Sequence, residues 1–134
     1  MARRLIIDTG VLVASERGST PLRDSIVDDD DLVIAAITVA ELRVGIALAS
    51  AHHRPARADF LISVLETLPV EPYDLATAEA HGRLLAHVHR AGTKPGAHDL
   101  IVAATAVATR RTVLTTDRNA HFAELPGVDC FVVG

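Results

Sequence analysis

The sequence predicts an α/β fold with a mainly parallel central sheet. Short apolar runs of strand length alternate with longer segments of helical periodicity along the chain. Several short runs, such as RRLIID and LVIAAI, are apolar at successive positions, which is typical of parallel strands buried on both faces. Aromatic residues make up only 3% of the chain, so we expect a core of Ala, Val, Leu and Ile.

Five segments are predicted to be strands, and their C-terminal ends are of most interest. Two of them, residues 3–8 and 112–117, end in a carboxylate. The carboxyl ends of parallel strands meet at one edge of a sheet, which is where open α/β sheets bind ligands. The other predicted strands are residues 32–37, a poor and short segment at 69–73, and residues 129–133.

Helices are predicted between these strands from apolar periodicity and from residues that begin or end helices. Thr38 and Glu41 have the spacing of a capping box, and Gly92 is typical of a residue that closes a helix. The last predicted helix is apolar on nearly every side, which indicates a buried central helix. The predicted helices begin after Gly10 and cover residues 19–29, 38–53, 57–68, 74–92 and 98–111.

Length and composition narrow the class of protein. At 134 residues the chain has the length of one ordinary domain, so we expect residues 1–134 to form a single domain. With one cysteine, no secretory signal and no apolar run near the roughly 20 residues that span a bilayer, we expect a cytoplasmic protein with no membrane role. The net charge of −4 argues against binding nucleic acid through bulk positive potential. Divalent cations in an acidic site would reverse that sign locally.

Four acidic residues are predicted to converge on one edge of the sheet. Asp8 and Asp117 end two of the strands, while Glu41 and Asp99 fall in the first turns of two helices that follow strands or loops at the same edge. Each acid also has a structural explanation as a turn residue, a helix cap or a favourable charge at a helix start. Caps, however, have no reason to gather at one edge.

Electrostatics limits what such a cluster can be. Two carboxylates about 4 Å apart repel by roughly 4 kcal/mol at an effective dielectric constant near 20. A domain is stable by only about 5 to 15 kcal/mol, so a cluster of four needs a counter-charge. The sequence offers few Lys or Arg residues beside these acids. A hard divalent cation with oxygen ligands and retained water is the natural counter-charge.

Four segments of the chain resemble the motif blocks of the PIN domain family. They are LIIDTGVL, ITVAEL, AHDLIVAATA and LTTDRNAHF, and together they are more closely similar to the VapC-type toxins of bacterial toxin–antitoxin pairs. The resemblance runs from Arg4 to the last strand. It implies a three-layer α/β/α PIN-like domain and an endoribonuclease dependent on Mg²⁺ or Mn²⁺ that leaves a 5′-phosphate. It also implies that Asp8, Glu41, Asp99 and Asp117 form the acidic, metal-binding catalytic site.

The resemblance assigns supporting roles to further residues. Thr9 and Thr115 match small hydroxyl positions beside two of the acids. The fourth acidic position varies in such proteins, so Asn119 is a further candidate near Asp117. A non-toxin PIN domain that processes RNA in another context would carry the same motifs and remains an alternative.

Substrate and partners also follow from the resemblance. RNA is the implied substrate, and Arg43, Lys94 and Arg118 are the basic residues near the motifs that could contact it. A toxin of this type would be held inactive by a separate cognate antitoxin protein and would commonly form a homodimer.

Three other functional classes compete with this interpretation. The Asp-Thr-Gly triplet at residues 8–10 is also found in aspartic proteases, but that chemistry belongs with small all-β subunits. A phosphatase or phosphoacceptor domain would use Asp8 as a nucleophile, and the haloacid dehalogenase pattern needs an acid where Gly10 stands. The third alternative is a non-catalytic α/β module whose acids are helix caps.

Other features receive structural explanations. The aspartates 28–31 form a run of like charge, which is usually a solvated loop. His98 could orient Asp99 or reach substrate, although a partly exposed histidine at a helix start is the simpler interpretation. Cys130 is most simply a small core residue. A zinc site is not expected, because the i, i+4 spacing that brings two ligands to one helical face is missing from His81, His87 and His89.

Overall fold

A parallel β-sheet forms the centre of the molecule. The computed structural model describes residues 2–18, 22, 25–117 and 122–133. Within these residues, five strands pair in the order β3-β2-β1-β4-β5, and every pairing is parallel. The predicted parallel sheet is therefore confirmed. The strands are β1 (Arg4–Ile7), β2 (Asp31–Ala35), β3 (Val70–Glu71), β4 (Thr112–Thr115) and β5 (Cys130–Val132).

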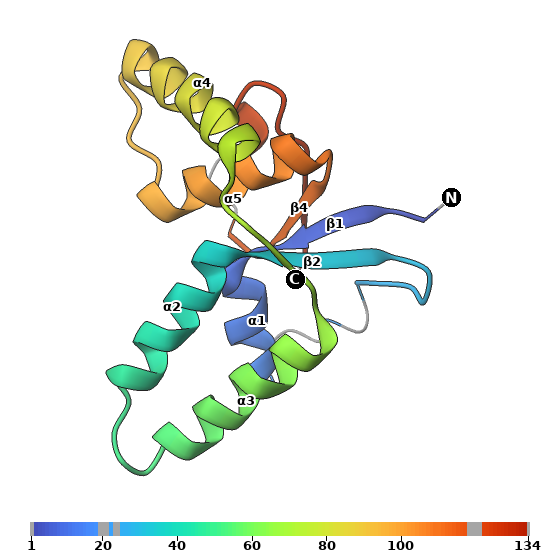
Figure 1. Ribbon diagram of the computed structural model, residues 1–134, viewed down its shortest axis with the longest axis vertical. Coiled ribbons are helices and arrows are strands. Elements are labelled where there is room, and N and C mark those ends of the chain that lie inside the picture. The colour runs from blue at the N-terminus through green and yellow to red at the C-terminus, as the bar shows by residue number, and fades with distance from the viewer. Residues whose placement is uncertain (1, 19–21, 23–24, 118–121, 134) are drawn as a thin grey trace.

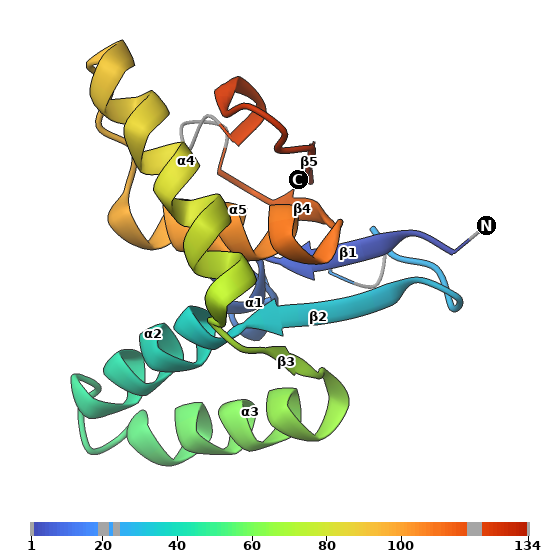
Figure 2. The same ribbon diagram turned by 45° about the horizontal axis from the view of Figure 1, so that its top comes forward.

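Helices cover both faces of this sheet. Figures 1 and 2 show α4 and α5 on one face and α1, α2 and α3 on the other, so the fold has the three α/β/α layers that were expected. No described helix is both long enough and apolar enough to cross a membrane. The helices are α1 (Thr9–Glu16), α2 (Ala36–Ala47), α3 (Arg54–Thr67), α4 (Leu75–Ala91) and α5 (Ala97–Thr109), and a short 3₁₀ turn, η3, covers Phe122–Glu124.

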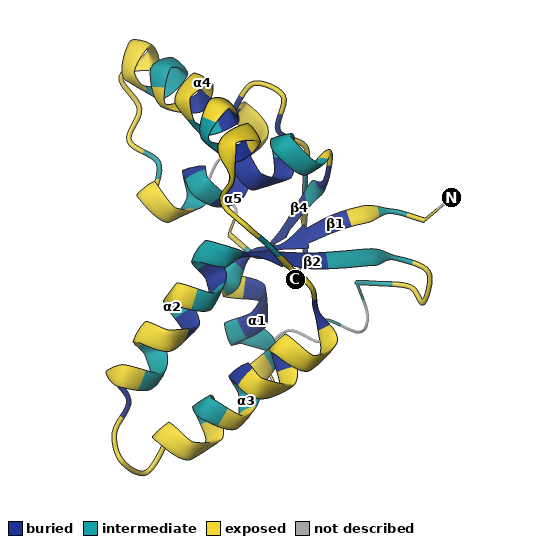
Figure 3. Ribbon diagram, in the orientation of Figure 1, coloured by how far each residue is buried: buried dark blue, intermediate teal, exposed yellow. Residues whose placement is uncertain are grey.

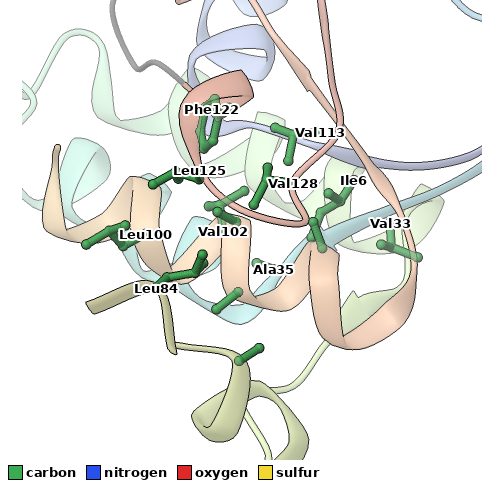
Figure 4. Packing of buried hydrophobic residues seen from close by; sticks show 14 residues of the cluster. Ile6, Val33, Ala35, Leu84, Leu100, Val102, Val113, Phe122, Leu125 and Val128 are labelled. Carbon is green, nitrogen blue, oxygen red and sulfur yellow. The ribbon is translucent and has the colours of Figure 1, made fainter. Parts of the chain in front are cut away.

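Two hydrophobic cores lie between these layers because neighbouring strand residues face opposite sides of the sheet. Ile6 packs toward α4 and α5, together with Val102 of α5, as Figure 4 shows. Ile7, the next residue, packs toward α1, α2 and α3, together with Leu61 of α3. The central strand positions are buried on both sides (Figure 3), as their continuous apolar sequence predicts.

The strand order reverses between β1 and β4. The chain passes from β1 outward to β2 and β3, and then returns to place β4 and β5 on the other side of β1. In an open parallel sheet, the crevice at the carboxyl ends of such a pair is the usual place for a ligand. Asp8 directly follows β1, and Thr115 is the last residue of β4.

The predicted start of the helix at Thr38 is wrong. Strand β2 runs directly into α2, whose N-cap is Ala35 and has no side-chain hydrogen bond. Thr38 therefore lies inside the first turn, and Glu41 lies in the second turn instead of the first. The capping box fails because the helix begins two residues earlier, at an apolar sequence with no polar cap to mark it. The helix also ends earlier than predicted, at Ala47.

The helix predicted over 74–92 is confirmed, whereas the one predicted over 19–29 is not found in the part that the structure describes. Gly92 closes α4 with a φ of 70°, as its sequence predicts, and Asp74 caps the other end of the helix by accepting from the Thr77 N–H at 3.1 Å. Of the predicted helix over 19–29, residues 19–21, 23 and 24 lie outside the described residues, and residues 25–29 form no helix.

The acidic run 28–31 is not a solvated loop throughout. The carboxylate of Asp30 pairs with the Arg3 guanidinium at 2.6 Å, and that of Asp31 pairs with Arg4 and with Arg111 at 3.2 Å each. Arg111, at the end of the helix predicted over residues 98–111, is 8% exposed and also donates to the backbone carbonyl of Asp31. Asp30 and Asp31 are paired because the run lies where β2 begins and meets basic residues from other segments.

Candidate functional site

Asp8 is a buried carboxylate at the point where the strand order reverses. It is 6% exposed and is also the N-cap of α1, because its Oδ1 accepts from the Thr9 backbone N–H at 3.0 Å. The Thr115 hydroxyl donates to its other oxygen, Oδ2, at 2.9 Å. The pKa of Asp8 is raised to about 6, chiefly by burial and also by the charges of Asp99 and Glu41, while the hydrogen bonds from Thr115 and Thr9 lower it.

Asp99 lies in the first turn of α5, as predicted. Burial raises the pKa of this carboxyl, and the charges of Asp117 and Glu41 act in the same direction, while His98 lowers it. Its carboxylate folds back over the start of the helix, where a Cβ on Gly96 would stand 2.7 Å from Oδ2. Gly96 thus leaves the space that Asp99 occupies, a role that no sequence pattern indicated.

Glu41 projects from the second turn of α2 and is held at both carboxylate oxygens. The Thr9 hydroxyl donates to Oε1 at 2.7 Å. His98 Nδ1 lies 3.3 Å from Oε2, although the His98 side chain is 57% exposed. The sequence suggested that His98 could orient its neighbour Asp99, but its ring nitrogen lies beside Glu41.

Asp117 stands two residues beyond β4 and is exposed. Its backbone N–H donates to the Thr115 hydroxyl at 3.0 Å, so Thr115 connects the end of β4 to Asp8. The charge of Asp117 acts on Asp99. Two further candidates from the sequence, Arg118 and Asn119, lie outside the described residues.

The four acids therefore come together at one edge of the sheet, close enough to perturb one another. Asp8 responds to the charges of Asp99 and Glu41, and Asp99 responds to those of Glu41 and Asp117. In the described part of the chain, neither Asp8 nor Asp99 pairs with Lys or Arg. The arginines there that form ion pairs are Arg3, Arg4 and Arg111, and their partners are Asp30, Asp31 and Glu71.

The oxygen ligands that these residues offer fit a hard cation that keeps several of its water molecules. Carboxylate and hydroxyl oxygens supply the edge of the site, and Mg²⁺ commonly binds through one or two carboxylates while keeping several waters. Among residues 2–18, 22, 25–117 and 122–133, no three His, Cys, Asp or Glu side chains form a ready-made cage for a metal ion. The residues thus fit an open, partly hydrated cation, and they do not fit a closed structural metal centre.

Two cavities meet at Glu41. One is lined by Glu41, Asp99 and the start of α5 from Gly96 to His98. The other lies between α1, α2 and α3, with an apolar floor that includes Phe60. Arg17 and Arg57 also line this second cavity, and sequence analysis missed both, because neither is near a motif in the chain.

The basic candidates from the sequence lie farther from the acids. Arg43 is exposed on α2 two positions beyond Glu41, and side chains at this spacing do not share a helical face. Lys94 lines a separate depression along the end of α4.

Comparisons with known proteins agree with the fold. The family model described as PIN domain matches residues 5–128. The chain is 36% identical to Ribonuclease VapC5 from Mycobacterium tuberculosis over 91% of this chain and 87% of the relative. It is similar to VapBC-5, a toxin-antitoxin system from the same organism, with a TM-score of 0.80, 29% identity and coverage of 97% and 98% of the two chains. VapBC2 from Rickettsia felis, bound to a DNA fragment from their promoter, has the same fold, with a TM-score of 0.88, 18% identity and coverage of 98% and 99%.

Proposed function

Because this chain belongs to the PIN domain family, we propose that it is a VapC-type ribonuclease that hydrolyses RNA phosphodiester bonds internally with a divalent cation. The observation that carries the proposal is the convergence of Asp8, Glu41, Asp99 and Asp117 at the point where the strand order reverses. The pKa of Asp8 and that of Asp99 are both raised there, and neither carboxylate has a Lys or Arg partner among the described residues. Such a cluster is suited to holding positive charge beside a phosphate.

Asp8 and Asp99 are the proposed direct ligands of Mg²⁺ or Mn²⁺, since each is fixed where a rigid element ends or begins. Glu41 and Asp117 would bind the same cation through water or help to hold a second one. When bound, the cation would lower the pKa of a water molecule and stabilise the charge that develops on the phosphate. Thr9 and Thr115 are proposed to keep the carboxylates in position through the hydrogen bonds described above.

Basic residues are proposed to guide the RNA. Arg43, Lys94 and Arg118 remain candidates from the sequence. The cavity between α1, α2 and α3 adds Arg17 and Arg57 beside Glu41. Since phosphate contacts from arginine are strong and directional, these two residues are the first to test in RNA binding.

We further propose that the protein is the toxin of a toxin–antitoxin pair. The names of the similar structures describe VapBC systems, which supports a cognate antitoxin as partner. A partner segment in the cavity between α1, α2 and α3 would lie against Glu41 and would block the site. A homodimer, a cytoplasmic location and a single domain over residues 1–134 complete the proposal.

Two of the competing functions lack support. The aspartic protease interpretation requires all-β subunits, whereas this sheet is parallel and covered by helices. The phosphatase interpretation still lacks the acid that the haloacid dehalogenase pattern needs two residues after Asp8, where Gly10 stands.

The test is RNA cleavage by the purified protein with Mg²⁺ or Mn²⁺, compared with the isosteric variant Asp99→Asn and with excess EDTA. We expect cleavage that leaves 5′-phosphate ends, a loss of at least about a hundredfold in Asp99→Asn, and no cleavage with EDTA. Equal cleavage by the variant would refute the site. The absence of Mg²⁺ or Mn²⁺ binding at the acid cluster would favour the non-catalytic module. Cleavage without growth arrest when the antitoxin is absent would favour a non-toxin nuclease.

A further inference from the structure

Thr38 is a buried hydroxyl next to the acid cluster that the proposed function does not use. It lies in the first turn of α2 and is 0% exposed. Its hydroxyl oxygen is 3.0 Å from that of Thr9, which belongs to α1. A polar side chain that is fully buried needs a hydrogen-bond partner, and for Thr38 that partner belongs to another element of the fold.

Apart from Thr9, the other helical threonines of the described residues bond within their own helix or to its N-cap, as Thr77 does to Asp74 Oδ1 at 3.0 Å. The hydroxyls of Thr67, Thr105 and Thr109 each donate to the backbone carbonyl four residues earlier in their own helix, at 2.7, 2.8 and 2.7 Å respectively. That local bond is the common arrangement for a threonine in a helix. Thr38 instead spans from α2 to α1.

The direction of the hydrogen bond between Thr38 and Thr9 follows from the number of protons that each group can donate. An ionised carboxylate can only accept hydrogen bonds, and a hydroxyl has one proton to donate. The Thr9 hydroxyl lies 2.7 Å from Glu41 Oε1, so its proton is committed to Glu41. In the contact between the two hydroxyls, Thr38 must then be the donor and Thr9 the acceptor.

We propose that Thr38 is a positioning residue for the nuclease site, which fixes the Thr9 hydroxyl so that its proton points at Glu41. The inference rests on the proposed function, since it assigns Glu41 to the cation site. The chain of hydrogen bonds runs from Thr38 to Thr9 to Glu41, and each bond strengthens the next because it polarises the shared hydroxyl. Because Thr38 is 0% exposed, it would contact neither the cation nor the RNA.

The contacts of Glu41 support a role for Thr38 in orienting this carboxylate through Thr9. Oε1 of Glu41 is held by Thr9, while Oε2 lies beside His98 of α5. Glu41 is therefore oriented from α1 on one oxygen and from α5 on the other. Without the hydrogen bond to Thr38, the Thr9 hydroxyl would be free to rotate away from Glu41.

The experiment measures Mn²⁺ affinity by titration calorimetry, together with kcat and KM for RNA cleavage. We expect Thr38→Val, which keeps the shape and removes the hydroxyl, to weaken Mn²⁺ binding by about tenfold, the low end of what partners of metal ligands contribute. Thr38→Ser should restore wild-type affinity, and kcat should fall in Thr38→Val with little change in KM. Thr38→Ala serves as a second variant if valine impairs folding, which circular dichroism will reveal.

The control is Thr105→Val, which removes another buried hydroxyl, bonded locally within α5. It should leave the Mn²⁺ affinity unchanged. A double-mutant cycle adds a further test: if Thr38 acts through Thr9, then Thr38→Val should have no additional effect in a Thr9→Val background.

Wild-type affinity in both Thr38→Val and Thr38→Ala would overturn the inference while leaving the proposed function intact. Full additivity in the double mutant, or failure of serine to rescue, would also overturn it. If the wild-type protein bound Mn²⁺ no better than Asp99→Asn does, the proposed function itself would fail, and the role of Thr38 with it.

Discussion

Thr115 and Asp8 are joined by a hydrogen bond of 2.9 Å that crosses from β4 to the end of β1, where the strand order reverses. The same Thr115 hydroxyl accepts from the Asp117 backbone N–H at 3.0 Å. A residue that is 0% exposed thus uses its one hydroxyl to position two of the four acids. This bond also opposes the effect of burial on the Asp8 carboxyl.

Replacing Thr115 with valine should weaken the site and the fold together. The pKa of Asp8 should rise further, since the Thr115 hydrogen bond lowers it. The midpoint of Mn²⁺ binding against pH should therefore move to higher pH, and calorimetry at several pH values would measure this shift. Buried polar groups left without a partner cost about 1 to 3 kcal/mol of unfolding free energy. Thr115→Ser should behave as wild type, and a valine variant with an unchanged binding midpoint would contradict this role.

Asp8 should make the metal-free protein less stable as the pH rises. Its pKa is about 6 in the fold, against 3.8 for an ordinary Asp. Between these values the folded chain retains a proton that the unfolded chain has lost, so this contribution to stability is complete below about pH 4 and is lost as the pH rises through about 6. The loss amounts to about 2 to 3 kcal/mol.

Urea unfolding in EDTA, from pH 4 to pH 7.5, would measure this contribution against Asp8→Asn as the control. The variant has no proton to lose, so it should lack this part of the decline and should exceed the wild type in stability at neutral pH. Parallel stability curves for the two proteins would show that Asp8 titrates normally.

Gly96→Ala should weaken Mn²⁺ binding while leaving the stability of the fold nearly unchanged. Gly96 has φ and ψ of −58° and 137°, which alanine adopts without strain. The added Cβ would stand 2.7 Å from Asp99 Oδ2, and a flexible carboxylate can turn away from it. We expect the unfolding free energy to change by less than about 1 kcal/mol, while Mn²⁺ affinity falls by about tenfold or more.

A suitable control is Gly82→Ala, because a Cβ there meets nothing within 4 Å. It should leave Mn²⁺ binding unchanged and should stabilise α4 by up to about 1 kcal/mol. If Gly96→Ala bound Mn²⁺ as well as Gly82→Ala does, the space above Gly96 would have no role in positioning Asp99.

Arg111→Leu should lower the stability of the fold and leave Mn²⁺ affinity nearly unchanged, which is the reverse of the effect expected for Gly96→Ala. Arg111 is 8% exposed and pairs with Asp31 at 3.2 Å, where β2 begins, away from the carboxyl ends of the strands. The change removes one of the two arginine partners of Asp31, which keeps Arg4, and it also removes the donor to the Asp31 carbonyl, at a cost of about 1 to 3 kcal/mol. Thermal unfolding should detect the loss, and Mn²⁺ affinity should stay within about twofold of wild type. A marked loss of affinity in a folded variant would contradict this separation.

Much of the site could be predicted because strand ends and helix starts are visible in the sequence. Asp8 follows a continuous apolar run, and Asp99 lies in the first turn of a helix that is apolar on nearly every side. Both positions depend on local patterns that the structure retains. Glu41 was assigned to the correct helix but to the wrong turn, because α2 begins at Ala36 with no polar residue to mark its start.

The residues that sequence analysis missed depend on contacts between distant segments. Thr38 has the spacing of a helix cap, and only the approach of α1 to α2 places it against Thr9. Gly96 lies in a segment where glycine is expected for a turn, so its role beside Asp99 has no separate signal. Arg111 has the sequence of a solvated helix end, and its burial depends on β2 and β1 lying beside it.

The most direct test of the central claim is a Mn²⁺ titration of the wild-type protein and Asp99→Asn, followed by electron paramagnetic resonance of the free ion. We predict that the wild type binds at least one Mn²⁺ per chain at the acid cluster and that Asp99→Asn lowers the affinity by at least about tenfold. Equal binding by the two proteins would contradict the account, because the four carboxylates would then not form the cation site.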